Sequence, residues 1–204
     1  MELLLTRYPD LAVCQAELAQ ARDLLIHCFE QGGKLLLCGN GGSCADCDHI
    51  TGELLKGFMK KRPLSPQLRQ ALAAQCPDLD PDKLQQGLPA ISLPALTALN
   101  TAFCNDVEPA HCFAQSVLAL GKPGDVLICI STSGNAVNVN AAAQVAKATG
   151  LTVVALTGES GGALRTVADC CICVPRNQTY QVQELHLPVY HYLCAAVESH
   201  FFPE

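Results

Sequence analysis

Two short loops in this sequence contain the residue types that hold a phosphate group. The first is Gly39-Asn40-Gly41-Gly42-Ser43, which follows a short apolar run and precedes a helical pattern. The backbone N–H groups of such a loop and the helix N-terminus behind it can bind an anion. Alone the motif is weak, because glycines also occur wherever a tight turn needs a positive φ. A dinucleotide site is disfavoured, because the third glycine of that fingerprint is missing and Ile91-Ser92-Leu93 offers no acid for a ribose.

The second loop, Ser131-Thr132-Ser133-Gly134-Asn135, also stands between an apolar run and a helical pattern. Three hydroxyls, a glycine and a helix start can donate several hydrogen bonds to phosphate oxygens without a net cation. One of these residues could cap the helix, but three adjacent hydroxyls exceed that need. This loop is the stronger prediction of a phosphate contact.

A histidine and a glutamate follow the first loop at helical spacing. His49 and Glu53 are four residues apart and so share one face of the expected helix, while Ile50 and Leu54 turn towards the core. A pair at this spacing is more often a surface pair than a site. The neighbouring phosphate loop shifts the interpretation towards acid–base chemistry.

The last helical pattern carries a second group of polar residues around Pro188. Glu184 and His191, seven residues apart, align better on a helix than Gln183 and His191, eight apart. The proline could bend the helix between them. Periodicity alone leaves the choice between Gln183 and Glu184 open.

Short apolar runs alternate with helical patterns along the chain. Strands are expected at 34–38, 88–93, 125–130, 151–156 and 170–174, and helices at 10–31, 94–104, 110–120, 137–149 and 182–202. Strands separated by helical crossovers indicate a parallel sheet covered on both faces. In such sheets the ligand lies beyond the carboxyl ends of the strands, where both loops are placed.

Length and composition predict one domain over residues 1–204. The segment 58–87 breaks the alternation, because it is polar and proline-rich around a short helical stretch at 66–74, and it is interpreted as an insertion or lid. Its basic residues, including Arg62, fit a solvated turn better than a phosphate contact.

Charge and hydropathy exclude several classes of partner. The net charge of −6 leaves no basic stripe for nucleic acid. No apolar run approaches the roughly 20 residues that a membrane helix needs, and the N-terminus shows no signal-peptide pattern. With 50% apolar and 16% charged residues, the chain could also bury surface against copies of itself.

The thirteen cysteines are odd in number and lack the spacing of a disulfide scaffold, which favours a reducing cytoplasm. Most are expected to pack as small hydrophobic residues. A metal or redox site at Cys44 and Cys47, or at Cys170, Cys171 and Cys173, is disfavoured. The first pair enters a helix, and the second group lies on a strand that sends alternate side chains to opposite faces.

In their order and spacing these motifs resemble the SIS (sugar isomerase) domain family, and within it the phosphoheptose isomerases. Asn105-Asp106 and Leu156-Thr157-Gly158 add to the match, which covers nearly all of the chain outside 60–87. The resemblance implies a three-layer α-β-α sandwich of the flavodoxin or Rossmann type, with a five-stranded parallel sheet and a long N-terminal helix. It also implies a homotetramer with active sites where subunits meet.

The resemblance also assigns roles to residues. Glu53 corresponds to the general base and His191 to the general acid, and a zinc ion is bound in some members at positions matching His49, Glu53, Gln183 and His191. It therefore favours Gln183 over Glu184. The expected substrate-binding residues lie in the two loops and at two further places: Asn40, Gly41, Gly42, Ser43, Asn105, Asp106, Ser131, Thr132, Ser133, Asn135 and Gln183.

The expected reaction is the aldose–ketose isomerisation of a sugar phosphate, most simply sedoheptulose 7-phosphate, without a nucleotide cofactor. One proton moves between C1 and C2 through an enediol, which a carboxylate and an imidazole can serve near neutral pH. Zinc would stabilise the enediolate as a Lewis acid, although glutamine is a weak ligand.

The sequence departs from the family pattern at three positions that concern sugar recognition. Cys44 stands in place of a histidine, Ala136 in place of a serine, and Tyr180 where an acid is frequent. The alternative function is a non-catalytic phosphosugar-binding regulator or adaptor of the same family. The presence of both Glu53 and His191 favours an enzyme.

Overall fold

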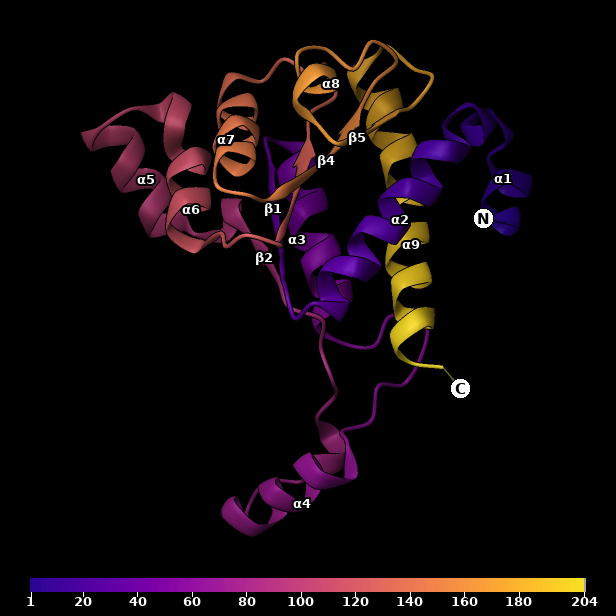
Figure 1. Cartoon of the computed structure of the whole chain (residues 1–204), viewed down its shortest axis with the longest axis vertical. Helices are drawn as coiled ribbons and strands as arrows, with labels where there is room; N and C mark the ends of the chain where they lie inside the picture. Colours follow the sequence, from indigo (N-terminus) through magenta and orange to yellow (C-terminus); the bar gives the residue numbers. More distant parts are fainter. Residues whose placement is uncertain (204) are drawn as a thin grey trace.

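Five parallel strands form the middle layer of the computed structural model, which describes residues 1–203 (Figure 1). The strands are β1 (Leu35–Gly39), β2 (Ala90–Ser92), β3 (Val126–Ile130), β4 (Thr152–Thr157) and β5 (Cys170–Cys173), in the order β2-β1-β3-β4-β5. Every residue of β1 and β3 is buried, as expected for strands that are covered on both faces. The predicted α/β fold with a five-stranded parallel sheet is confirmed.

The helices connect and cover these strands. They are α1 (Glu2–Arg7), α2 (Gln15–Glu30), α3 (Gly42–Leu55), α4 (Pro66–Gln75), α5 (Thr97–Asp106), α6 (Cys112–Leu120), α7 (Val137–Ala148), α8 (Leu164–Val167) and α9 (Thr179–Phe201), with short 3₁₀ turns at Pro9–Cys14, Pro81–Lys83, Leu93–Ala95 and Pro109–His111. Within the described residues, no helix combines the length and the apolarity that crossing a membrane requires.

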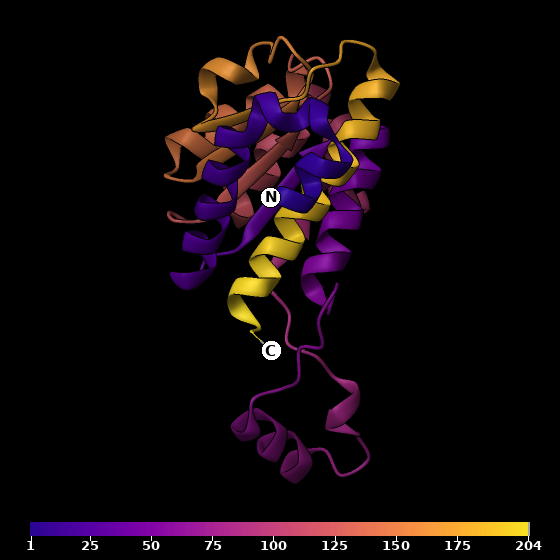
Figure 2. The same ribbon diagram turned by 90° about the vertical axis from the view of Figure 1, so that its right-hand side faces the viewer.

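The two faces of the sheet carry separate apolar cores. Leu35 and Leu37 of β1 pack with α2, α3 and α9, whereas Leu36 and Cys38 pack with α6, α7 and α8. The division follows from the pleat, which sends successive side chains to opposite faces. Figures 1 and 2 show α2, α3 and α9 together on one side of the sheet.

The N-terminal helix begins later than its periodicity predicts. Residues Pro9–Cys14 form a 3₁₀ turn, and the α-helix starts only at Gln15. Leu11 and Cys14 are nevertheless buried. Because a 3₁₀ turn has about three residues per turn, positions i and i+3 share a face in both conformations, and apolar spacing cannot distinguish them.

All thirteen cysteines are free thiols. Cys38 and Cys129 lie 3.8 Å apart between their Sγ atoms inside the core, where they pack as small apolar residues. Cys171 and Cys173 share one face of β5 with Sγ atoms 3.5 Å apart, and burial raises the pKa of Cys171 to about 12. Such a thiol stays protonated at neutral pH, which disfavours a redox site there.

Residues 58–87 project from the body as an arm that carries α4 (Figures 1 and 2). In the two perpendicular views α4 lies well away from the sheet, and none of its side chains is buried (Figures 1 and 2). The helix predicted at 66–74 is confirmed, whereas the role of the arm as a lid stays a prediction. Arg62 at its base was wrongly expected in a solvated turn, because the side chain is 0% exposed and lies against Glu198.

The arm is expected to be dispensable for folding. Its two stems meet where Gln86 N donates to the carbonyl of Arg62 at 2.8 Å, so a three-residue Gly-Asn-Gly link can replace residues 64–84. Since α4 adds no side chain to either core, the deletion should change the free energy of unfolding by less than about 1 kcal/mol. Urea denaturation of both proteins measures this, and a larger loss would show that the arm supports the body.

Candidate active site

The two predicted phosphate loops lie side by side at the point where the strand order reverses. β1 leads through α3 towards β2 on one side, and neighbouring β3 leads through α7 to β4 on the other. Ligands of open α/β sheets bind at such a switch point, beyond the carboxyl ends of the strands. The side chains of Asn40 and Asn138 exchange two hydrogen bonds of 2.9 Å, which join the first loop to the first turn of α7.

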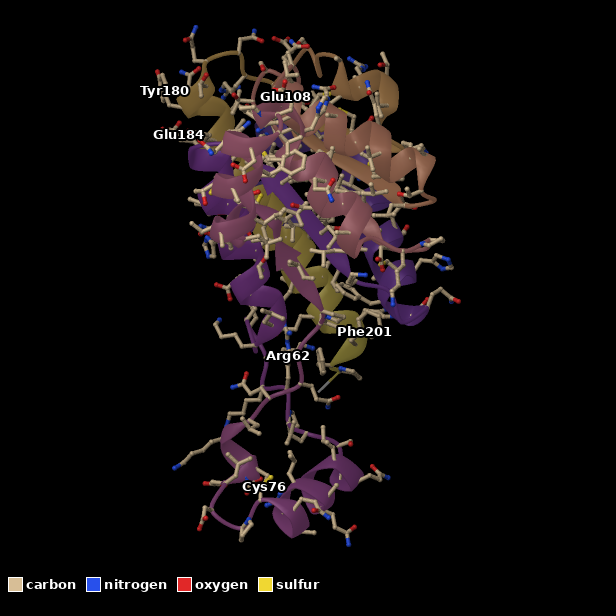
Figure 3. All side chains as sticks on the ribbon, turned by 90° about the vertical axis from the view of Figure 1, so that its left-hand side faces the viewer. Arg62, Cys76, Glu108, Tyr180, Glu184 and Phe201 are labelled. Atoms are coloured by element: carbon tan, nitrogen blue, oxygen red, sulfur yellow. The ribbon has the colours of Figure 1, made fainter. Side chains whose placement is uncertain are left out.

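Glycines shape the first loop. Gly41 has φ 55° and ψ −120°, a combination that favours glycine, and it precedes α3 without a side-chain cap. A Cβ on Gly42 would collide with Nε2 of Gln183 on α9, so the missing side chain lets Gln183 close over the loop. Glu184 is exposed on the outer surface of α9 (Figure 3). Of the two residues that helical periodicity left open, Gln183 is the one that contacts the first loop, and its role in the site stays a prediction.

The hydroxyls of the second loop are not used to cap a helix. α7 follows Ala136 and has no side-chain cap. Asn135 supports the loop, because its Oδ1 accepts a hydrogen bond from the Ala163 amide at 2.9 Å and its own amide donates to Oγ of Ser133 at 3.1 Å. The loop therefore has a defined shape, and its serine and threonine hydroxyls are not needed by the helix start.

The candidate acid and base come together where α3 packs on α9. His49 Nε2 lies 3.2 Å from Glu53 Oε1, and Lys56 Nζ lies 2.8 Å from Glu53 Oε2. The His191 ring lies 5.1 Å from the His49 ring between centroids, and 5.4 Å from the Phe58 ring. His191 Nε2 is buried and has no hydrogen-bond partner among the described residues. A nitrogen in that state is available to a ligand.

The electrostatics of this cluster suit the roles expected of its members. Burial acts to raise the pKa of Glu53, but the hydrogen bonds and positive charge of Lys56 and His49 outweigh it, so the pKa is lower than usual. Burial and the nearby His49 lower the pKa of His191, although Glu53 opposes them. At neutral pH Glu53 is therefore a carboxylate that can take a proton. His191 is a neutral imidazole that can donate an N–H hydrogen bond.

Sequence reasoning missed the residues that orient His49. The Tyr190 hydroxyl lies 3.1 Å from His49 Nδ1 and donates to Asp46 Oδ1 at 3.2 Å. Burial raises the pKa of Tyr190, so the phenol stays protonated at neutral pH. The available signal was helical spacing, because Asp46 precedes His49 by three residues and both lie on the face that meets α9.

Two of the predicted substrate-binding residues lie elsewhere in the chain. Asn105 and Asp106 are exposed at the end of α5 and hydrogen-bond to each other at 2.8 Å. α5 packs on α6, on the opposite side of the sheet from α3 and α9 (Figure 1). One chain does not bring these two residues to Glu53 and His191.

The four residues predicted to bind zinc do not converge within one chain. Gln183 lies against Gly42, and it precedes His191 by eight positions of α9, which is about 12 Å along a helix. α9 continues through Pro188 as one helix from Thr179 to Phe201. The described residues contain no group of three His, Cys, Asp or Glu side chains placed to hold a metal ion.

Two protein-family models match different parts of the chain. Residues 11–79 and 97–195 each match a model described as SIS domain. Among curated proteins, a phosphoheptose isomerase of Thiobacillus denitrificans is 43% identical over 183 residues, which are 88% of this chain and 81% of that protein. One from Roseiflexus sp. is 41% identical over 180 residues, 88% of this chain and 80% of that protein.

Solved structures agree with these relatives. A phosphoheptose isomerase from Francisella tularensis superposes with a TM-score of 0.79 at 32% identity, covering 95% of this chain and 91% of that one. The phosphoheptose isomerase from Neisseria gonorrhoeae gives a TM-score of 0.73 at 30% identity, covering 97% and 98%. The similarity therefore extends over nearly the whole chain.

Proposed function

This chain belongs to the SIS domain family and, within it, to the phosphoheptose isomerases, and we propose that its substrate is sedoheptulose 7-phosphate. It is an isomerase. The observation that supports the proposed chemistry best is the close grouping of Glu53, His49 and His191 where α3 meets α9. A phosphosugar-binding regulator would not need an ionised carboxylate beside an unpartnered imidazole.

The proposed mechanism assigns each step to a side chain. The carboxylate of Glu53 removes a proton from the carbon next to the carbonyl and returns it to the neighbouring carbon. An N–H of His191 donates a hydrogen bond to the carbonyl oxygen, which stabilises the charge that develops there. His191 then carries the hydroxyl proton of the neighbouring carbon to that oxygen, so the sugar regains its O–H group. The backbone and hydroxyl groups of Gly39–Ser43 and Ser131–Asn135 hold the phosphate and so fix the register of the sugar chain.

The proposed assembly is a homotetramer whose active sites lie between subunits. Two features of the single chain support shared sites. Asn105 and Asp106 belong to α5, which packs against the core on the opposite face of the sheet from α3, the helix that carries Glu53. Ser43 and Glu53 are ten residues apart on α3, which is about 15 Å. Light scattering coupled to size-exclusion chromatography measures the molar mass of the assembly directly.

Zinc binding by His49, Glu53, Gln183 and His191 stays a prediction. Three of these residues are neighbours in one chain, whereas Gln183 would have to come from another copy. Elemental analysis of the purified protein, repeated on a His49→Ala variant, tests the prediction without relying on activity.

A cytoplasmic location also stays a prediction and rests on the number and spacing of the cysteines.

The decisive experiment for the function is proton exchange with solvent at the two carbons that the reaction interconverts, C1 of the ketose and C2 of the aldose. Sedoheptulose 7-phosphate incubated with the protein in deuterated water should gain deuterium and convert to its aldose isomer, as followed by NMR. A panel of pentose, hexose and heptose phosphates then identifies the preferred sugar. Binding of the sugar without exchange would contradict the enzyme and favour the regulator.

Lys56 is expected to determine the pH below which kcat/KM falls. Its ammonium stabilises the ionised form of Glu53 from 2.8 Å, so Lys56→Met should raise the pKa of Glu53. Because the base must be ionised, kcat/KM should then begin to fall at a higher pH than in the wild type. The profile of kcat/KM between pH 4 and 8 measures the shift, with Lys60→Met as the control. An unchanged acid limb would contradict the pairing.

A further inference from the structure

A fully buried ion pair lies at the base of the arm, next to the candidate active site. Arg62 and Glu198 are both 0% exposed, and Arg62 Nε donates to Glu198 Oε1 at 2.8 Å. Figure 3 shows Arg62 where the arm meets the end of α9, near Phe201. Buried ion pairs are poor sources of stability, because desolvation offsets their attraction and apolar replacements are often equally stable. The contacts of this pair suggest another role.

The Arg62 side chain caps the C-terminal end of α3, the helix that carries the candidate base. Its Nη1 donates to the carbonyl of Leu54 at 2.6 Å, and its Nη2 donates to the carbonyl of Glu53 at 3.0 Å. The last carbonyls of a helix have no partner within that helix. The planar guanidinium supplies three donors in one fixed arrangement, which lysine cannot reproduce. The backbone of Glu53 is therefore held directly by Arg62.

Glu198 binds the segment that packs next to His191. Its carboxylate accepts hydrogen bonds from three consecutive amides, those of Phe58 at 2.7 Å, Met59 at 2.7 Å and Lys60 at 3.1 Å. The ring of Phe58 lies 5.4 Å from that of His191. Glu198 also follows His191 by seven residues, or about two turns of α9. The carboxylate thus fixes Phe58 against the helix that presents His191.

We propose that Arg62 and Glu198 are positioning residues that set the distance and orientation between Glu53 and His191. The inference rests on the proposed function. Both side chains are fully buried, so we expect neither to contact the substrate. Arg62 binds the end of α3 through the carbonyl of Glu53. Glu198, on α9, binds the amide of Phe58. The ion pair between Arg62 and Glu198 therefore connects the end of α3 to α9. A displacement of about 1 Å at a reacting group can reduce a rate by about 100-fold.

The test compares Arg62→Lys and Glu198→Gln with the wild type at a temperature where thermal melting shows all three proteins folded. Each variant should lower kcat by about 10- to 100-fold. The KM for sedoheptulose 7-phosphate should change by less than about threefold, because the phosphate loops lie at the other end of α3. Arg69→Lys and Asp82→Asn alter the exposed 2.6 Å pair on the arm and should change neither constant. Variants at 62 and 198 with wild-type kcat would overturn the proposal.

A double variant separates positioning from stability. Arg62→Met with Glu198→Leu replaces the pair by apolar side chains, which should restore much of the melting temperature that the single variants lose. We expect kcat to stay low, since the carbonyl of Glu53 and the amide of Phe58 lose their partners. Recovery of kcat together with the melting temperature would mean that the pair only stabilises the fold.

The wild-type protein distinguishes failure of this inference from failure of the proposed function. An inactive wild type would refute the function. In that event the imidazole resonances of His191, observed by NMR, still report on positioning. They should shift in Arg62→Lys and Glu198→Gln and stay unchanged in Arg69→Lys. Unshifted resonances in the first two variants would refute the inference.

Discussion

Replacing Glu53 with glutamine is expected to lower kcat by about 10²- to 10⁴-fold, the range that general acid–base catalysis contributes. Glutamine keeps the shape of the side chain but cannot accept a proton from carbon. The two loops that we expect to hold the phosphate lie at the far end of α3 and are untouched by the change. The affinity for the sugar phosphate should therefore stay close to that of the wild type.

Calorimetric binding and proton exchange in deuterated water measure these two effects separately. The chain offers a matched control in Glu30, which pairs with His200 at 2.9 Å on the exposed surface. Glu30→Gln removes the same kind of interaction and should leave exchange unchanged. If Glu53→Gln kept full activity, Glu53 could not be the base.

Gly134→Ala is expected to destabilise the protein more than any other single methyl addition in the two loops. Gly134 has φ 68°, and a Cβ there would collide with the backbone of Gly161 and Gly162 in the loop before α8. Backbone atoms cannot rotate away as a side chain can. The loop that contains Gly134 and the loop that contains Gly161 must therefore move apart. We expect a loss of about 2–4 kcal/mol, part of it from the left-handed conformation itself. The KM for the sugar phosphate should also rise, because the hydroxyls of Ser131–Ser133 move.

Gly124→Ala isolates the conformational part of this effect. Gly124 also has a positive φ, 91°, but a Cβ there would meet no atom within 4 Å. Its loss should be near the 1–2 kcal/mol of the left-handed conformation alone, with an unchanged KM. Denaturation of both variants in urea gives the comparison. Equal losses would show that the contact with Gly161 carries no energy.

Local sequence was sufficient to predict the five strands, most of the helices and the two loops of the site. Apolar runs such as 125–130 are too short for a helix and become strands, and β3 runs from Val126 to Ile130. Ile50 and Leu54 are both 2% exposed, which agrees with the face of α3 that helical spacing assigns to the core. These features are local, because hydrogen bonds and side-chain directions repeat every few residues and leave a period in the sequence.

Tertiary structure alone decided which distant side chains meet. The proximity of Glu53 to His191 depends on how α3 and α9 pack, and Gln183 rather than Glu184 reaches the first loop because α9 turns that face towards Gly42. The burial of Arg62 depends on Glu198, which lies 136 residues later. Periodicity reports which face of a helix is buried, but not which residue of another helix it meets. That pairing is set by the packing of whole elements, which no short stretch of sequence contains.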